Sequence, residues 1–380
     1  MRTLKVDIVN IIAYALFLAL FKIYFIPEII RQIFKVVVIL FTIFFLIKNL
    51  HTKKIFNISL TLTVWIIITG LINYMGNGYT LKSFLDSILY ALSFYCIYTF
   101  SIYCGYNNKI DCLIISLYKI TKIYCLLTIV SVLMVGTNNN SNSAVYFFGN
   151  KFSSSYFFIL LSSLYCASHD MRNRKNKKKL FIILIFTIVF STYLKCATVT
   201  VATAVMLCIY VMPKKIRIFL FSPKAVVVEL LLSGGLVIGM DSFLKINIIN
   251  KIVVNLFNKS YTISGRLLIY DKYLWVLLKN KWFIGYGYNN GKMLMLTKGI
   301  FSNTQNGLFE IILNFGVLGM LVFLYTIYYT LNKAKKTDQY YAINILICSM
   351  IIAAVFEVSL NWFFLLGISL IRAFEFRNED

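Results

Sequence analysis

Long apolar runs separated by short polar loops dominate this chain. A helix that crosses a bilayer needs roughly 20 mostly apolar residues. Such runs predict about twelve transmembrane helices, near residues 6–26, 33–48, 55–75, 83–104, 113–136, 152–168, 180–195, 196–212, 224–240, 306–330, 340–356 and 358–373. The pattern therefore predicts an all-α polytopic membrane protein.

Charged residues alternate from loop to loop along the chain. With the N-terminus placed inside, the inward loops are rich in lysine and arginine: KNLHTKK (48–54), GYNNKID (105–111), HDMRNRKNKKK (169–179), PKKIRIFLFSPK (213–224) and NKAKK (332–336). The outward loops 76–80 and 137–150 carry no charge, and only the first outward loop, with Glu28 and Arg31, is a mild exception. Because cytoplasmic loops carry an excess of Lys and Arg, both termini are expected in the cytoplasm.

The chain then divides into nine helices in 1–240, a large external loop at 241–305 and three helices in 306–380. The loop is strongly basic, with Lys245, Lys251, Lys259, Arg266, Lys272, Lys279, Lys281, Lys292 and Lys298 against Asp241 and Asp271. Long loops escape the charge rule, so this excess does not contradict the topology. Two explanations stay open: a lysine-rich genome, or a loop that binds an anionic ligand such as a phosphate.

One part of the loop is amphipathic. Its apolar residues fall on one helical face, namely Leu267, Tyr270, Leu274, Leu277 and Leu278. A short helix of this kind lies in the membrane interface or caps a cavity that opens outward. Gly285 and Gly287 are expected to end it.

Composition narrows the class of protein further. The chain is 60% hydrophobic and 14% charged, with a mean hydropathy of +0.79, which excludes a soluble domain. The net charge of +24 is scattered between apolar runs, so no nucleic-acid partner is expected. Eight cysteines without Cys-x-x-Cys spacing and two histidines predict no metal site. Arg2 and Lys5 precede an apolar run without a small-residue cleavage site, so the first helix is expected to be retained.

Three stretches carry a resemblance to a known family. They are SGRLLIYDKYLWVLLKNKWFIGYG (264–287), NTQNGLFEIILNFGVLGMLVFL (303–324) and STYLKCATVTVATAV (191–205). Together they resemble the signature of the O-antigen polymerase and ligase superfamily: Ser/Thr-Gly-Arg, an aromatic-bearing helix, a Gly-x-Gly turn, then His-Asn before a helix with Gly-x-x-Gly. The large late external loop resembles the family too. Lys195 stands where arginine is common.

The resemblance implies a metal-independent membrane glycosyltransferase with a GT-C-like fold and no cofactor, in the bacterial inner membrane. Its substrates would be an oligosaccharide donor and acceptor, each linked to a polyprenyl pyrophosphate such as undecaprenyl pyrophosphate. Membrane lipid, a chain-length regulator and a flippase would be its other partners. The product would be O-antigen or capsular polysaccharide of the cell envelope.

One departure separates the branches of the superfamily. Many members have His-Asn where this chain has Gln305-Asn306. In the ligase branch that histidine is thought to activate the acceptor hydroxyl, so its absence favours a repeat-unit polymerase. Two alternatives stay open, an O-antigen ligase and a lipid-linked oligosaccharide flippase or transporter. A flippase is expected to have internal repeats and no large late loop, and neither expectation fits this chain.

The resemblance and the charges together name the candidate site residues. Arg266 is the first candidate for gripping the pyrophosphate, because a guanidinium holds phosphate with two donors; its alternative is a pair with Asp271. Lys195 and Lys151 are further pyrophosphate candidates, and Lys195 could instead reach the headgroups.

Three neighbouring residues are candidates for handling the acceptor. Asn306, Glu310 and Asn314 recur at every fourth position and share a helix face. Catalytic roles are expected for Glu310 as a general base and for Gln305 and Asn306 beside it. The alternative for Glu310 is a pair with Lys195 or Arg266 that only positions the cation. Gly316 and Gly319 are expected to serve close helix packing.

Overall fold

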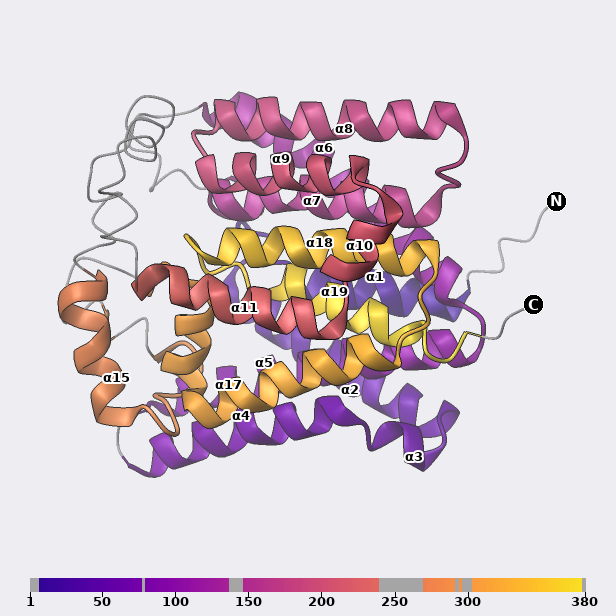
Figure 1. The fold of residues 1–380 in the computed structure, drawn as a ribbon. Coiled ribbons are helices and arrows are strands. Elements are labelled where there is room, and N and C mark those ends of the chain that lie inside the picture. Colours follow the sequence, from indigo (N-terminus) through magenta and orange to yellow (C-terminus); the bar gives the residue numbers. More distant parts are fainter. Residues whose placement is uncertain are drawn as a thin grey trace.

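The structure of the chain is a computed structural model that describes residues 7–76, 79–136, 146–238, 269–290, 294–295 and 303–377. These residues are helical and contain no strand, only an isolated bridge between Tyr146 and Gly149. The helices lie side by side in one bundle (Figure 1). They are α1 (Ile8–Leu20), α2 (Glu28–Asn49), α3 (Thr52–Ile55), α4 (Ile58–Met75), α5 (Leu81–Tyr106), α6 (Ile110–Val135), α7 (Lys151–Ser168), α8 (Arg174–Tyr193), α9 (Ala197–Val211), α10 (Lys214–Leu220), α11 (Pro223–Ile238), a π-helical turn η2 (Ile269–Leu274), α15 (Trp275–Lys281), α17 (Gly307–Lys333), α18 (Asp338–Ala354) and α19 (Trp362–Ala373). The expected all-α class is confirmed for the described residues.

Each of the expected transmembrane ranges overlaps a helix of the bundle. By length and apolar composition, however, 5 of the described helices can cross a membrane, or 6 when the bent pair α10–α11 counts as one span. These are α2, α4, α5, α6 and α17, whereas α1, α9, α18 and α19 are shorter apolar helices. The expected number of crossings and the GT-C-like fold therefore stay predictions.

Local capping moves several helix ends away from their expected positions. The side chain of Asn173 accepts from the backbone N–H of Lys175 at 2.9 Å, so α8 begins at Arg174 and takes the basic run into its first turns. Asn361 accepts from Phe363 N–H at 3.1 Å, and α19 therefore begins at Trp362. Hydrophobic runs do not mark such capping positions.

The expected loop at 213–224 contains a short helix instead. This helix, α10, has no buried residue, and its side chains Ile216, Ile218 and Phe219 are exposed beside Lys214 and Arg217. An exposed helix with an apolar face and a basic face is typical of the membrane interface. A bend of 64° joins it to α11.

The bundle has two distinct ends. Two ion pairs form at the start of α6: Asp7 pairs with Lys109 at 3.2 Å, and Arg377 pairs with Asp111 at 3.3 Å. The two ends of the described chain therefore meet at one end of the bundle, called here the terminus end. The helix α15 lies at the opposite end, called here the loop end (Figure 1).

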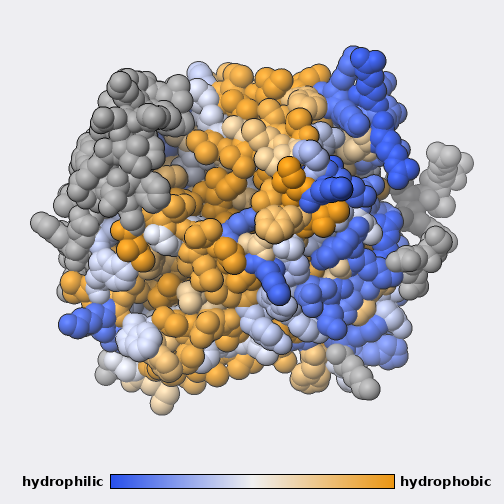
Figure 2. Space-filling model, in the orientation of Figure 1, coloured by the Kyte–Doolittle hydropathy of each residue, from blue (hydrophilic) through white to orange (hydrophobic). Residues whose placement is uncertain are grey.

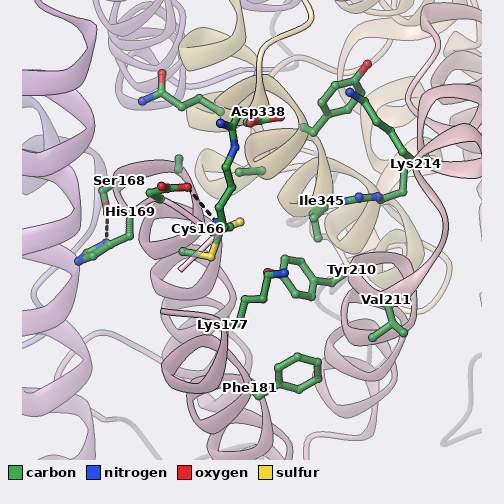
Figure 3. A pocket seen from close by; sticks show the side chains of 18 residues that line it. Cys166, Ser168, His169, Lys177, Phe181, Tyr210, Val211, Lys214, Asp338 and Ile345 are labelled. Atoms are coloured by element: carbon green, nitrogen blue, oxygen red, sulfur yellow. Dashed lines mark hydrogen bonds between the residues drawn. The ribbon is translucent and has the colours of Figure 1, made fainter. Parts of the chain in front are cut away.

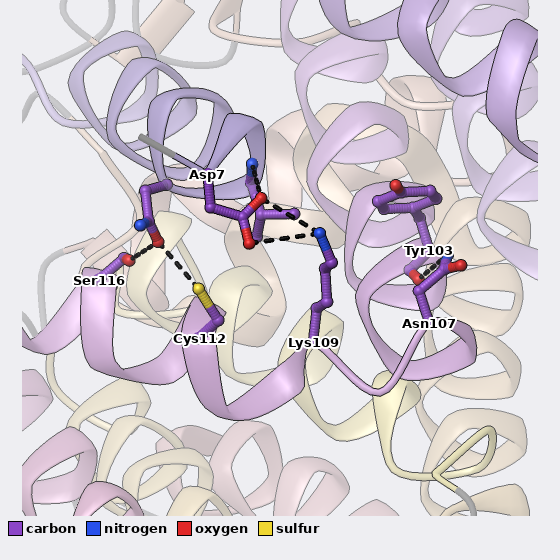
Figure 4. A network of polar contacts seen from close by, with 8 residues as sticks. Asp7, Tyr103, Asn107, Lys109, Cys112 and Ser116 are labelled. Carbon is purple, nitrogen blue, oxygen red and sulfur yellow. Dashed lines mark hydrogen bonds and ion pairs between the residues drawn. The ribbon is translucent and has the colours of Figure 1, made fainter. Parts of the chain in front are cut away.

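A polar network fastens the terminus end (Figure 4). The ammonium of Lys109 donates to both carboxylate oxygens of Asp7, each at 3.2 Å. Close by, Oδ1 of Asn10 accepts from the Ser116 hydroxyl at 2.6 Å and from the Cys112 thiol at 3.0 Å. These contacts join α1 to α6 at the edge of the bundle.

The surface of the bundle is apolar between its two ends. Figure 2 shows hydrophobic side chains across the middle of the visible face and hydrophilic ones gathered toward the terminus end. Residues in the middle of helices, such as Leu40, Leu126 and Ile182, expose 62%, 55% and 65% of their surface. A water-soluble protein rarely exposes so much contiguous apolar area, so this belt faces lipid and the chain is a membrane protein.

Candidate functional site at the loop end

The structure gathers most of the expected site residues at the loop end. Gln305, Asn306 and Glu310 lie at the start of α17, Lys151 lies at the start of α7, and Lys195 lies in the turn between α8 and α9. Arg266 falls in 239–268, outside the described residues, so its role as a pyrophosphate ligand stays a prediction.

The carboxylate of Glu310 is held in place by three hydrogen-bond donors. Its Oε2 accepts from the backbone N–H of Thr304 at 3.1 Å and lies 3.0 Å from the Thr304 hydroxyl. Its Oε1 accepts from the amide of Asn314 at 3.3 Å. Glu310 is half-buried, and donors that fix both of its oxygens set the direction in which the carboxylate can meet a further group.

The turn before α17 is strained at Gln305. This residue has φ of 54°, in the left-handed region that side chains with a Cβ seldom adopt. Its backbone N–H and its side-chain amide both donate to Oδ1 of Asn303, at 2.9 and 2.7 Å, and its carbonyl accepts from the Tyr270 hydroxyl at 3.1 Å. Strain that the surroundings hold in place is often found at functional sites.

Asn306 is fully buried and acts as the N-cap of α17. Its Oδ1 accepts from Phe309 N–H at 3.0 Å, while its Nδ2 donates to the carbonyls of Ser233 at 2.9 Å and Val355 at 3.3 Å. These bonds tie the start of α17 to α11 and to the end of α18. The described contacts of Asn306 are therefore structural, and a contact with substrate stays a prediction.

The Gly-Tyr-Gly turn packs its backbone against a break in α17. Gly316 has φ of 71° inside the helix, and Gly285 and Gly287 have φ of 80° and 84°. Across this break, Tyr286 N–H donates to Leu313 O at 2.9 Å, Gly287 N–H to Asn314 O at 2.7 Å, and Val317 N–H to Trp282 O at 2.8 Å. A Cβ on Gly316 would come within 2.1 Å of Phe283 O, so only glycine fits there.

Sequence reasoning gave these glycines only part of their function. Gly285 and Gly287 do follow the end of α15, as expected, but the N–H groups of Tyr286 and Gly287 also satisfy carbonyls that the break in α17 releases. Gly316 was expected to pack helices and instead interrupts one. Gly319 does serve close packing, because a Cβ there would lie 2.6 Å from the indole nitrogen of Trp65 on α4.

Side chains from α4 complete this junction. The amide of Asn73 donates to Gly285 O at 3.1 Å and accepts from the ammonium of Lys281 at 2.6 Å. The indole of Trp65 donates to Phe315 O at 3.0 Å. The expected buried face of the loop helix is confirmed here, since Tyr270, Leu274, Leu277 and Leu278 are buried, and Leu267 lies outside the described residues.

An aromatic cluster lies next to the Glu310 network. Tyr288 stacks on Tyr90 with ring centroids 4.0 Å apart, and Tyr90 packs against Trp362 at 4.8 Å. The ammonium of Lys35 lies 5.5 Å from the centre of the Trp362 ring. Burial, and then the carboxylates of Asp86 and Glu310, raise the pKa of the Tyr288 phenol above its usual value, so the phenol stays protonated.

A pocket opens beside this cluster between the last residues of α1 and the first turns of α2. Its volume is about 400 Å³, and three cations, Lys22, Arg31 and Lys35, line it among apolar side chains. The amide of Gln32 donates to Oδ1 of Asp86 at 3.2 Å and connects this wall to α5. Lys35 was missed from the sequence, although a single cation inside an otherwise apolar run is a signal of function.

Lys195 occupies a position that normally favours glycine. Its φ is 53°, its N–H donates to Thr192 O at 2.9 Å, and the N–H of Cys196 donates to Ser191 O at 2.8 Å. This pair of bonds is the Schellman motif, in which the left-handed residue after a helix is usually glycine. A lysine at this position costs conformational energy that a glycine would not. Its presence therefore supports a function for the charged side chain.

Lys151 lies in a second charged group at the same end. It is 5% exposed, and both Lys151 and Glu357 lie within electrostatic range of the Cys196 thiol, which directly follows Lys195. The first residue of α7, the turn between α8 and α9, and the segment between α18 and α19 therefore meet. Lys151 therefore lies close to the turn that carries Lys195, another of the expected pyrophosphate ligands.

The loop end thus combines two hydrogen-bonded carboxylates, several cations of which Lys151 is buried, a cluster of aromatic rings, and a pocket lined by both apolar and basic side chains. Carboxylates such as Glu310 and Asp86 can accept protons, lysines and arginines can bind phosphate, and aromatic faces can pack against sugars. No group of three or more His, Cys, Asp and Glu side chains that could hold a metal ion occurs in the described part of the chain.

Comparison with known proteins agrees with this chemistry. A family model described as O-antigen ligase matches residues 180–324, from α8 to the middle of α17. The match includes Lys195, Gln305, Asn306 and Glu310. No curated protein and no solved structure gives a significant match. Over residues 180–324 the chain is therefore similar to the O-antigen ligase family, which supports a place in the O-antigen ligase and polymerase superfamily.

Proposed function

We propose that this chain transfers an oligosaccharide from a polyprenyl pyrophosphate to a sugar hydroxyl of a second lipid-linked repeat unit, and so acts as a repeat-unit polymerase. The observation that carries this proposal is the Glu310 carboxylate, fixed by Thr304 and Asn314 at the loop end. Its position inside a stretch similar to the O-antigen ligase family supports the same reaction class.

The proposed step is a displacement at the anomeric carbon. The acceptor oxygen forms a bond to that carbon while the bond to the pyrophosphate oxygen breaks, and the pyrophosphate leaves with the electron pair. The acceptor proton passes to Glu310, which acts as the general base. Arg266, Lys195 and Lys151 would bind the negative charge that develops on the leaving group.

The reaction would take place on the outer face of the cytoplasmic membrane. Basic segments such as 172–179, 214–217 and 333–336 lie at the terminus end, opposite the site. Because cytoplasmic loops carry the excess of Lys and Arg, this distribution supports a cytoplasmic terminus end and an external loop end.

A polymerase and a ligase differ in the acceptor. Both histidines lie at the terminus end, His51 before α3 and His169 after α7, so neither can replace the histidine that the ligase branch uses. Gln305 at that place favours the polymerase. The ligase is the second candidate, because the matching family model is described as O-antigen ligase.

Membranes from cells that express the chain would test the proposal. They would be supplied with a purified polyprenyl-pyrophosphate-linked repeat unit, and the products would be separated by size. We expect a ladder of lipid-linked polymers that is absent from matched membranes carrying Glu310→Gln. Transfer of single units to a lipid A core acceptor, without a ladder, would contradict the polymerase and favour the ligase.

A further inference from the structure

A second pocket lies at the terminus end, far from the candidate catalytic site. It has a volume of about 640 Å³ and is lined by the end of α7, the segment after it, and the facing parts of α8, α9, α10 and α18. In Figure 3 the labelled side chains Lys177, Tyr210 and Lys214 come from three different helices around the same hollow. Nothing in the proposed sugar transfer uses this pocket.

The lining of this pocket is basic. Arg172, Lys177, Lys214 and Arg217 line it together with His169, and its acids are Asp170 and Asp338. Asp170 closes a local turn, since its Oδ1 accepts from the backbone N–H of Arg172 at 2.9 Å. Within the part of the chain that the structure describes, no carboxylate lies within ion-pair distance of the four lysine and arginine side chains.

Arg217 has a special place in this lining. Its Nε is buried and has no hydrogen-bond partner among the described residues. The guanidinium lies within electrostatic range of Cys166, Tyr210 and Tyr341, which are side chains of α7, α9 and α18. A buried guanidinium donor without a partner is costly, and an acceptor bound in the pocket would satisfy it.

The tendency of cytoplasmic loops to be basic does not explain why these cations line one pocket. Positive loops obey the sidedness rule wherever their lysines point, and many lysines here, such as Lys178 and Lys215, do not line the pocket. In contrast, Lys177 and Lys214 come from segments about 40 residues apart and line one hollow. That convergence is the property of a binding site for an anion.

The position of the pocket identifies the source of the anion. One wall is α10, whose Ile216, Ile218 and Phe219 are exposed in the manner of a helix at the membrane interface. Val211, which also lines the pocket, is 66% exposed at the end of α9. An occupant of this site would therefore have its phosphate among the cations and its apolar part along the lipid-facing surface.

We propose that this pocket binds the phosphate headgroup of an anionic phospholipid from the leaflet at the terminus end. The lysines and arginines bind the phosphate, and the acyl chains lie along α9 and α10. Anionic lipids are enriched in the cytoplasmic leaflet, where the proposed topology puts this end. The pocket would thus fix the depth and tilt of α8 to α11, the helices that lead into the candidate site.

Binding of lipid to the purified full chain would test this proposal. The protein would be delipidated in neutral detergent and titrated with short-chain phosphatidylglycerol or phosphatidylcholine, with bound lipid counted by native mass spectrometry. We expect saturable binding of one phosphatidylglycerol and at least tenfold weaker binding of phosphatidylcholine. Equal affinity for the two lipids would overturn the proposal.

Two matched double variants separate the pocket from the basic surface around it. Lys177→Gln with Lys214→Gln removes two cations that line the pocket, whereas Lys178→Gln with Lys215→Gln removes the neighbouring lysines, which are equally classed as exposed but do not line it. Each juxtamembrane cation contributes roughly fivefold, so the first pair should weaken phosphatidylglycerol binding about thirtyfold. The second pair should change it less than threefold, and an equal loss in both would indicate diffuse attraction and refute a defined site.

Two further measurements complete the test. Inorganic phosphate and ATP would be added as competitors; displacement of the lipid at similar concentrations would identify a soluble phosphate as the occupant and overturn the lipid proposal. Arg217→Lys keeps the charge but removes the buried Nε donor, and we expect about fivefold weaker lipid binding with an unchanged melting temperature. Unchanged lipid affinity in Arg217→Lys would remove this residue from the site.

Discussion

The backbone N–H and the hydroxyl of Thr304 both approach the same carboxylate oxygen of Glu310, at 3.1 and 3.0 Å. Thr304 lies in the turn before α17, and Glu310 lies in the first turn of that helix. Glu310 thus accepts from a backbone N–H that precedes the helix, as the acidic residue of a capping box does, while Asn306 is the N-cap residue of α17. The other oxygen, Oε1, accepts from the side-chain amide of Asn314 at 3.3 Å.

Glu310→Gln should remove most of the polymer-forming activity. The amide keeps the shape and most hydrogen bonds of the carboxylate but cannot take the acceptor proton, and the loss of a general base costs about 10²- to 10⁴-fold in rate. The measurement is the rate of ladder formation in membranes at equal protein level, between about pH 6 and pH 9. The loss should persist at high pH.

Thr304→Ser and Gln305→Ala separate catalysis from positioning. Serine retains the hydroxyl, so Thr304→Ser should keep near-normal activity. If Gln305 holds the acceptor instead, Gln305→Ala is the damaging change and Glu310→Gln is mild. That second pattern would contradict the role of Glu310 as the base.

Lys195→Gly should stabilise the protein while lowering its activity. Glycine relieves the left-handed backbone at φ 53°, which is worth roughly 1 kcal/mol, and removes the charge proposed to bind pyrophosphate. A higher melting temperature together with a raised KM for the lipid-linked donor is the expected result. Asn108→Gly is the control, because Asn108 also has φ of 53° but lies at the terminus end; it should gain less stability, since asparagine tolerates the left-handed region better than lysine, and should keep full activity.

Arg266→Ala should abolish polymer and leave single repeat units on the lipid carrier. Arg266→Lys should restore little, because two phosphates need the planar pair of donors and not a point charge. Gel analysis of lipid-linked products checks both variants. Polymer of normal length from the alanine variant, at equal protein level, would rule out the proposed pyrophosphate grip.

Gly316→Ala should destabilise the protein strongly. A Cβ there meets Phe283 O at 2.1 Å and also needs the left-handed backbone at φ 71°, so a loss of roughly 3 kcal/mol or more is expected. The melting temperature of the purified protein in detergent measures this effect. Gly235→Ala is the control, since a Cβ at that helical glycine meets nothing within 4 Å and should be neutral or stabilising by up to about 1 kcal/mol. Equal changes in melting temperature for the two substitutions would contradict the close backbone contact between Gly316 and Phe283.

Asp7→Asn should weaken the terminus end in a pH-dependent way. The N–H of Val9, followed by Lys109, holds the pKa of Asp7 below its usual value against the opposing effect of burial. A carboxylate whose pKa is lower in the folded chain stabilises the fold at pH values above its pKa in the unfolded chain, which is near 3.9. This stabilisation is lost as the pH falls through the pKa of the folded chain. The variant should therefore differ from the wild type by less than about 1 kcal/mol near neutral pH, because the side chains are partly exposed. The two curves should converge below about pH 4. Unfolding curves from pH 3 to pH 7 measure this, and a difference that grows on acidification would contradict it.

Hydrophobic runs were sufficient to predict most of the longer helices, because a helix that crosses a membrane must be apolar over most of its length. They could not find α10, whose short length and mixed faces resemble a polar loop. They also could not find the break at Gly316, since a glycine in an apolar run has the same pattern whether it packs a helix or interrupts it. The break depends on the backbone of 282–287, which is remote in sequence.

The candidate site also has features that the sequence predicts and features that depend on tertiary contacts. Glu310, Gln305 and Lys195 were named as candidates because a resemblance or a helical spacing marks them, and the structure places all three at the loop end. The pairing of Lys35 with Trp362 and the capping bonds of Asn306 arise from tertiary contacts between distant helices. Spacing along one helix predicts which residues share a face, but it does not tell which partners face them.

The junction between the Gly-Tyr-Gly turn and the break in α17 also sets an order of events during biosynthesis. The ribosome delivers Trp65 and Asn73 first, the turn at 282–287 much later, and the carbonyls of Leu313 and Asn314 last. The turn therefore emerges before the backbone groups that it will bond to exist. Closure of the loop end must wait until α17 has been synthesised, so the candidate site is completed late in biosynthesis and a nascent chain halted before α17 lacks this junction.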